Sequence, residues 1–478
     1  MAATPGPTDP DDLAVTSVGA GRLGSHSVVY LAGTAVQGLG VLLILPFATR
    51  LLGLVEFGKV ATGLVVVQMV GTIAGAGLPQ VILREHHRGD DGPRVSRALA
   101  GTMITLALGL GVIGALLGLV LGTIGWADLA EWLPIVVASA SLTTVVAGQT
   151  LMRARLRPWG FLALAIAATV VAQLAGLLAA RAEPTAQRYL LAYAAVLAVV
   201  ALAGVVVTQP LLPTKERTRV RAGARLAAPL LPQAIAMLGL LMGDVLLTRA
   251  LLGEAAAGSY QVALQLGNVP FVLAVAFFNA WAPLVLSHPI ERRWPWTART
   301  GTALTTVVAV GAVGVALVGP WLVAVMTRPD FDTVAIVAAL GLISSVSVAY
   351  MIYQGSSLAV LDAERTGRLA WASVAALAML VLMARWLAPA HGIVGIATAK
   401  AVGYVVLMAL TVAFARAHSP LRWPPRLVVV WLASAALAVG ASLLPITGGG
   451  AVVRLLTAAV VAAVALVLAP RVLRVLRG

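Results

Sequence analysis

Two ionisable residues stand inside long apolar stretches of the sequence. Asp244 lies about midway along the apolar run 227–251, and Lys400 lies about half-way along the run 391–415. A charge at the centre of a membrane costs several kcal/mol unless it faces water or a partner. Asp244 is therefore a candidate carboxylate for coupling a proton or sodium ion to a conformational cycle. The alternative is structural: an ion pair or polar contact that joins two halves of the protein, with Lys400 as its partner.

Two arginines, Arg50 and Arg249, occupy matched positions in a short internal repeat. The repeat units are Thr49–Gly53 followed by Gly58, and Thr248–Gly253 followed by Gly258, and one inserted residue aligns them. Six apolar runs separate the two units, an even number, so the repeat predicts two parallel halves related by an axis along the membrane normal. Arginines at span ends usually extend to the membrane interface, and these two could instead bind an anionic group of a substrate.

The composition excludes a soluble protein. Sixty per cent of the 478 residues are apolar and 11% are charged, whereas soluble domains are about 45–50% apolar and about a quarter charged. The apolar runs are unbroken over many residues, which excludes the alternating pattern of an outer-membrane barrel. The chain has no cysteine, so it has no disulfide framework and no thiolate metal site. We expect an integral membrane protein built from helices.

Fourteen apolar runs approach or exceed the roughly 20 residues that a helix needs to span a bilayer. They cover 28–49, 60–83, 98–124, 132–152, 160–180, 189–208, 227–251, 258–286, 301–325, 333–354, 369–388, 391–415, 427–446 and 451–470. With the repeat, they predict an all-α polytopic membrane protein of about 14 transmembrane helices, with two six-helix bundles related by pseudo-two-fold symmetry. The expected parts are a cytoplasmic tail (1–26), the N-terminal bundle (27–208), a basic cytoplasmic linker (209–226), the C-terminal bundle (227–415), and helices 13 and 14 with a basic tail (416–478).

The net charge of +15 is mainly a topology signal. Most of the 33 lysines and arginines fall in connections on the side of the N-terminus, and the positive-inside rule places that side in the cytoplasm. Only three are lysines, a skew that fits a GC-rich bacterial genome. We expect a multi-pass protein of the bacterial inner (plasma) membrane, with both termini cytoplasmic and no nucleic-acid partner.

Several amides interrupt the apolar runs and could line a hydrated interior or link helices by hydrogen bonds. They are Gln37, Gln68, Gln149, Gln173, Gln233, Gln265, Asn268 and Asn279. No catalytic triad, phosphate-binding loop or metal-binding motif occurs. We therefore expect a protein that is not an enzyme and that holds no metal or cofactor.

The repeat units resemble a known family. Arg50-Leu51-Leu52-Gly53 with Phe57-Gly58 resembles the opening signature of bacterial polysaccharide and O-antigen flippases. Further segments that resemble the family are Asp244–Gly253 with Gly258-Ser259-Tyr260, and Gly392-Ile393-Val394-Gly395-Ile396-Ala397. With the fourteen runs, the likeness covers about residues 25–470. These flippases belong to the multidrug/oligosaccharidyl-lipid/polysaccharide (MOP) exporter superfamily.

The resemblance implies an alternating-access transporter that flips an undecaprenyl-pyrophosphate-linked oligosaccharide from the inner to the outer leaflet. Arg50, Arg249 and Lys400 would then bind the pyrophosphate on the wall of a positively charged cavity, and Asp244 would respond to a proton or sodium gradient. Besides the lipid bilayer and the substrate, expected partners are the polymerase and glycosyltransferases of the same pathway.

Three other functions stay open. A peptidoglycan-precursor (lipid II) flippase also has fourteen spans. A MATE-like drug/cation antiporter typically has twelve, and needs acids in its N-terminal half, where the first six runs hold no well-buried acid. A membrane polymerase or glycosyltransferase would need larger outside loops than this chain has.

Overall fold

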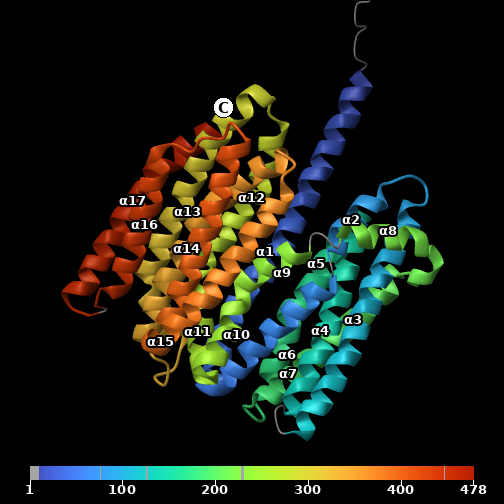
Figure 1. Ribbon diagram of the computed structural model, residues 1–478, viewed down its shortest axis with the longest axis horizontal. Helices are drawn as coiled ribbons and strands as arrows, with labels where there is room; N and C mark the ends of the chain where they lie inside the picture. Colours follow the sequence, from blue (N-terminus) through green and yellow to red (C-terminus); the bar gives the residue numbers. More distant parts are fainter. Residues whose placement is uncertain (1–9, 76, 125–127, 228–230, 446, 478) are drawn as a thin grey trace, which may run out of the picture.

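The computed structural model describes residues 10–75, 77–124, 128–227, 231–445 and 447–477, and every regular element in these ranges is a helix (Figure 1). Eleven of these helices are long and apolar enough to cross a membrane. The prediction of an all-α, multi-pass membrane protein is therefore confirmed. Two of the eleven, α1 and α15, each carry two of the predicted runs. The count of fourteen spans and the domain boundaries stay predictions.

The first part of the chain forms a bundle that ends in a short linker. Its elements are α1 (Pro10–Gly75), α2 (Leu78–His86), α3 (Gly92–Thr123), α4 (Leu129–Ala154), α5 (Pro158–Ile166), the π-helix η1 (Ala167–Val171), α6 (Ala172–Ala180) and α7 (Ala186–Thr208). The predicted linker contains the 3₁₀ turn η2 (Pro213–Glu216) and α8 (Arg217–Ala227).

The second part is larger and forms the other side of the molecule (Figure 1). Its elements are α9 (Leu231–Leu238), the π-helix η4 (Gly239–Gly243), α10 (Asp244–Leu252), α11 (Glu254–Gly267), α12 (Val269–Ser287), α13 (Ile290–Met326), α14 (Thr333–Asp362), α15 (Thr366–His418), α16 (Pro425–Leu443) and α17 (Gly449–Arg477). Helices α16 and α17, the predicted appendage, pack on α13.

The glycines that end the two repeat units have nearly the same backbone conformation. Gly53 has φ 74° and ψ −179°, and Gly253 has φ 89° and ψ −179°. Residues with a β-carbon rarely adopt a positive φ of this kind, so glycine permits the sharp bend at both sites. At Gly53 α1 divides into two arms, and at Gly253 α10 gives way to α11. The short sequence repeat therefore corresponds to a repeated local structure.

The second glycines of the repeat units, Gly58 and Gly258, meet where α1 crosses α11. A β-carbon at Gly58 would lie 1.9 Å from the carbonyl oxygen of Glu254, and one at Gly258 would lie 2.5 Å from that of Leu54. The contact is reciprocal, because each glycine faces the backbone that precedes the other. Only glycine allows two helices to approach this closely.

The two halves touch mainly through α1. Every extensive packing contact between the predicted N-terminal and C-terminal halves in the described residues involves α1, which lies against α9, α10, α11 and α13. The remaining N-terminal helices pack among themselves and on α1. Because a single helix forms most of the interface between the halves, this interface is narrow.

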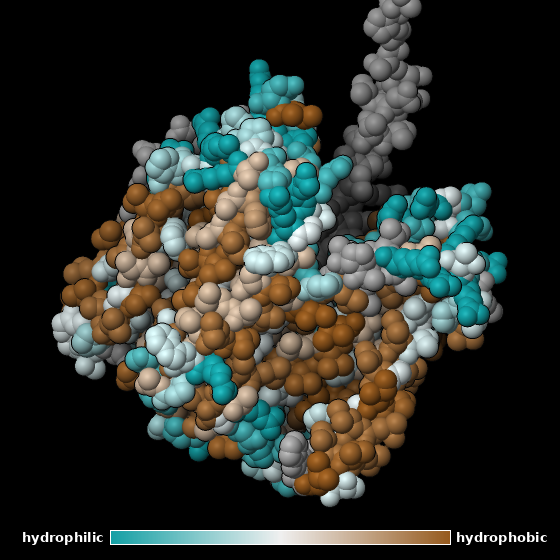
Figure 2. Space-filling view, in the orientation of Figure 1, coloured by the Kyte–Doolittle hydropathy of each residue, from teal (hydrophilic) through white to brown (hydrophobic). Residues whose placement is uncertain are grey.

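Contacts between connections agree with the predicted alternation of sides. At one end, Arg94 and Arg219 pair with Glu216 and Asp91 across the 84–97 and 209–226 connections, at 2.9 and 3.0 Å. At the other end, Lys59 pairs with Glu131 at 3.0 Å. The described start of α1, the linker and the C-terminus all lie at the first end (Figure 1). Figure 2 shows a hydrophobic belt between hydrophilic ends, as a protein that crosses a bilayer requires.

Candidate functional site

A cavity of about 460 Å³ lies between the two halves, directly beside the crossing of α1 and α11. Both arms of α1, together with α6 and α7, form one wall, and η4, α11 and α12 form the other. Its polar lining residues are amides and phenols: Gln68, Gln173, Tyr189, Tyr193, Gln261, Gln265 and Asn268. The cavity thus lies at the interface between the two halves.

Three of these amides form one polar stripe along α11 and the residue that caps its end. Gln261, Gln265 and Asn268 follow each other at intervals of four and three residues, which puts them on one face of a helix. The buried Oε1 of Gln261 and Oδ1 of Asn268 have no hydrogen-bond partner. An unpaired buried acceptor is costly, and both residues line the cavity, so a rotation of either side chain toward the cavity would let its oxygen accept a hydrogen bond from a bound molecule.

The opposite wall presents phenols and further amides. Tyr189 and Tyr193 lie one helical turn apart on α7, and Gln173 follows the π-helix η1. Such π-helical turns occur often at functional sites. Phe57 and Phe271 supply aromatic surface to the same cavity. The lining therefore combines apolar rings with neutral hydrogen-bonding groups.

Four amides that the sequence suggested, Gln68, Gln173, Gln265 and Asn268, line this cavity, whereas Gln149, Gln233 and Asn279 are not among its lining residues. The side chain of Gln37 lies outside the described residues. Sequence reasoning missed Gln261 and the two tyrosines. The four- and three-residue spacing on α11 and the four-residue spacing on α7 are the signals that could have found them.

Asp244 and Lys400 form a buried ion pair beside the cavity. The Nζ atom of Lys400 lies 2.8 Å from Oδ2 of Asp244, and both side chains are almost completely buried. The ammonium also donates to the carbonyl oxygen of Leu241 at 2.8 Å. The hydroxyl of Tyr260 donates to Asp244 Oδ2 at 2.6 Å. Leu241 is both a cavity-lining residue and part of η4, so the pair is directly behind the cavity wall.

The pair does not join the two halves, as the structural alternative for Asp244 had assumed. Both α10 and α15 lie within the predicted C-terminal bundle, and they pack against each other. For Lys400, the sequence left open whether it binds a pyrophosphate or pairs with Asp244, and in this structure it pairs with Asp244. The pair neutralises both charges inside one bundle, where either charge alone would be costly.

In this conformation the described lining of the cavity does not include the three predicted cations, and their role in binding a substrate stays a prediction. Arg50, Arg249 and Lys400 are not among the lining residues, and no described lining residue is charged. Each cation is engaged elsewhere. Arg50 is exposed and donates to the carbonyl oxygen of Val325 at 2.8 Å, and Arg249 pairs with Glu254 at 2.8 Å. An unpaired cation in this mostly apolar cavity would lose its hydration without compensation.

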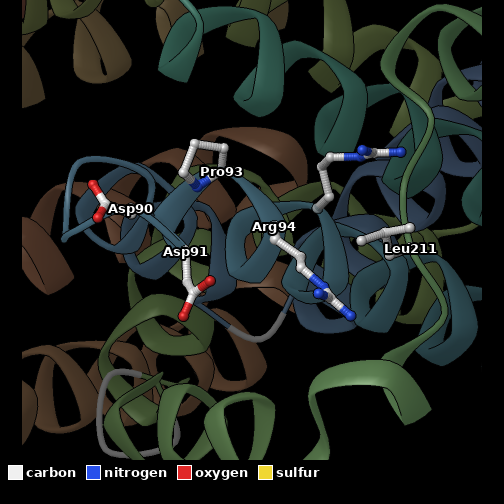
Figure 3. A pocket seen from close by; sticks show the side chains of 6 residues that line it. Asp90, Asp91, Pro93, Arg94 and Leu211 are labelled. Atoms are coloured by element: carbon white, nitrogen blue, oxygen red, sulfur yellow. The ribbon is translucent and has the colours of Figure 1, made fainter.

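A second hollow, of about 500 Å³, lies at the start of α3 (Figure 3). Asp90, Asp91, Pro93, Arg94, Arg97 and Leu211 line it. Its arginines are already engaged: Arg94 pairs with Glu216, and Nε of Arg97 donates to the carbonyl oxygen of Gln209 at 2.6 Å. These contacts fasten the linker to α3, which accounts for the hollow without a ligand.

Comparison with solved structures identifies the class of fold. The chain is similar to the lipid II flippase MurJ in an inward closed conformation, with a TM-score of 0.67 and 12% identity over 94% of this chain and 100% of that one. It is also similar to an inward-facing multidrug resistance MATE family transporter of the MOP superfamily, with a TM-score of 0.57 and 14% identity over 84% of this chain and 98% of that one. The protein therefore has the fold of MOP transporters.

The family follows from the sequence. The family model described as polysaccharide biosynthesis protein matches residues 24–287, more than half of the chain, and the chain belongs to this family. No curated protein matches it. The resemblance that the repeat units suggested is confirmed.

Proposed function

We propose that the protein flips a polyprenyl-pyrophosphate-linked oligosaccharide from the inner to the outer leaflet of the plasma membrane, for the synthesis of a cell-surface polysaccharide. The observation that carries the proposal is the cavity between the two bundles. Its amides and phenols provide donors and acceptors for sugar hydroxyls, and its aromatic rings provide apolar surface. Such a lining is suited to a glycan that passes through the cavity, as expected for a protein with this fold and in this family.

The mechanism would be alternating access about α1. In this conformation the reciprocal contact of Gly58 with Gly258 holds α1 and α11 together near one end of the bundles. The bundles diverge toward the other end, where α2 and α8 lie (Figure 1). With the predicted orientation, that end faces the cytoplasm. The glycan would enter there while the lipid tail stays in the bilayer, and rocking of the bundles would then open the cavity to the outside.

The pair of Asp244 and Lys400 is our candidate for ion coupling. The carboxylate is held by Lys400 at 2.8 Å and by Tyr260 at 2.6 Å, on a helix that contributes to the cavity wall through η4. A proton or sodium ion that neutralises Asp244 would release Lys400, and the freed ammonium would favour a different packing of α10 on α15. The gradient of that ion would then bias the cycle.

A test in the native host separates this function from its rivals. Depletion of the protein should make lipid-linked oligosaccharide accumulate on the inner leaflet while surface polysaccharide is lost, and re-expression should reverse both. Accumulation of lipid II with arrested peptidoglycan synthesis would favour the precursor flippase. Changed drug resistance with unchanged glycans would favour the antiporter. Either of these two results would contradict our proposal.

A further inference from the structure

We infer that the cavity selects an uncharged, hydroxyl-rich segment of the glycan and that the pyrophosphate stays outside it. The inference rests on the proposed function and adds a substrate class to it. It follows from the charge of the described lining, from two unpaired acceptors and from the spacing of the three amides Gln261, Gln265 and Asn268.

The charge of the described cavity lining disfavours an anionic ligand. No described residue that lines the cavity is charged. Lys400, directly behind the wall, is neutralised by Asp244, and Arg249 is neutralised by Glu254. An anion that entered would lose its water and gain no counter-charge, which is strongly unfavourable. A neutral sugar would lose only hydroxyl hydration, and the amides can replace those hydrogen bonds.

Two unpaired acceptor oxygens among the lining residues favour a ligand that donates hydrogen bonds. The unpaired Oε1 of Gln261 and Oδ1 of Asn268 are acceptors and need donors. Sugar hydroxyls and N-acetyl amides donate, whereas an ionised carboxylate or phosphate only accepts. An acidic sugar keeps its hydroxyl donors, but its carboxylate cannot donate to these oxygens and is repelled by their negative ends. The lining favours a donor-rich ligand on this ground as well.

The size of the cavity sets how long a segment of the glycan it can hold. From Gln261 to Asn268 the stripe extends about 10 Å along α11. The cavity volume of about 460 Å³ falls within the usual range for small-ligand sites, about 300–1,000 Å³. The site therefore accommodates a short segment of a glycan, and this segment determines which lipid-linked oligosaccharides are accepted.

Two matched substrates test the inference. The full-length protein in lipid nanodiscs is mixed with a polyprenyl diphosphate that carries a neutral disaccharide, or with the same lipid in which one hexose is replaced by its uronic acid. We expect the neutral compound to bind about tenfold more tightly or better, since each lost compensating interaction is worth about a factor of ten. Gln261→Leu should weaken binding of the neutral compound, and Gln261→Arg should shift the preference toward the acidic one. Asn279→Leu, at an exposed amide of α12 outside the cavity, is the control and should change neither.

Equal affinity for the two lipids, or preference for the acidic one by the unaltered protein, would overturn the inference, and so would an undiminished affinity of the Gln261→Leu variant. Preferential binding of the neutral lipid without any translocation would support the inference while the proposed flippase activity fails. The two proposals are therefore judged by different readouts.

Discussion

The ammonium of Lys400 lies 2.8 Å from the carboxylate of Asp244, and both are buried within the same bundle, directly behind the cavity wall. Removal of one member of such a pair leaves an uncompensated charge, whereas removal of both leaves none. The coupling role and the structural role of Asp244 therefore differ in what single and double variants should do.

We expect Asp244→Asn to lower the amount of folded protein in the membrane, because loss of the partner charge costs about 3–5 kcal/mol. Lys400→Met in the same chain should restore part of that amount. Quantitative immunoblotting of membrane fractions and thermal unfolding of the purified variants measure both effects. A single variant that is as abundant and as stable as the unaltered protein would contradict the importance of the pair for folding.

The double variant separates stability from coupling. If Asp244 couples an ion to transport, Asp244→Asn with Lys400→Met should be folded but should no longer respond to a proton or sodium gradient. The measurement is glycan translocation in vesicles with and without the imposed gradient. Full gradient-driven transport by the double variant would reduce the pair to a structural contact.

The crossing at Gly58 should tolerate no larger residue. We expect Gly58→Ala to separate α1 from α11 and destabilise this conformation by about 1–3 kcal/mol, the usual cost of overpacking, since the added carbon would meet the backbone at 1.9 Å. Gly314→Ala, at a helical glycine of α13 with no atom within 4 Å of the added carbon, is the control. Thermal unfolding of both purified variants checks the prediction, and equal midpoints would refute the close contact.

The sequence predicted the helices well because long apolar runs have one stable form in a bilayer. The repeat that ends at Gly53 and Gly253 was found from the sequence, but the similar backbone bends at these two glycines were seen only in the structure. It could not show that α1 carries most of the contact between the halves. In an apolar helix, a residue that faces lipid and one that faces protein have the same character, so hydropathy does not distinguish them.

Site residues were predicted unevenly for a related reason. Amides in apolar runs are conspicuous, and four of those named line the cavity. Cations within apolar runs or at their ends are equally conspicuous, but their type does not reveal whether an acid, a carbonyl or a substrate compensates them. Lys400 has an acid and Arg50 has a carbonyl. Among the described residues, the cavity lining is therefore uncharged in this conformation, although the sequence suggested cations there.

Backbone carbonyls also compensate the cation Arg454 in the C-terminal helices. Its side chain is completely buried, and it donates to the carbonyl oxygens of Leu444 at 2.5 Å and Pro445 and Leu317 at 3.3 Å. We expect Arg454→Lys to destabilise the packing of α17 on α13, because an ammonium cannot reproduce the planar fork of donors. Proteolytic susceptibility of the α16–α17 region reports the effect, and a cleavage pattern identical to that of the unaltered protein would count against it.

The orientation in the membrane gives a further prediction. A cysteine at the exposed Thr218 of α8 should resist a membrane-impermeant thiol reagent in intact cells, because the linker is expected in the cytoplasm. Ala182→Cys, at an exposed position in the connection between α6 and α7, should react readily. The cysteine-free sequence makes each signal unambiguous. The opposite labelling pattern would invert the orientation.

Translocation by the purified protein tests the proposed flippase activity most directly. A fluorescent neutral oligosaccharide on polyprenyl diphosphate is incorporated into both leaflets of vesicles, and a membrane-impermeant quencher then reports how fast the inner pool reaches the outer surface. We predict rapid and complete quenching in vesicles that contain the protein, and quenching of only the outer pool in vesicles without it. The proposed flippase activity would be contradicted if the inner pool stayed protected to the same extent and for the same time with and without the protein. In that comparison the protein must be folded, and an ion gradient must have been imposed in each direction.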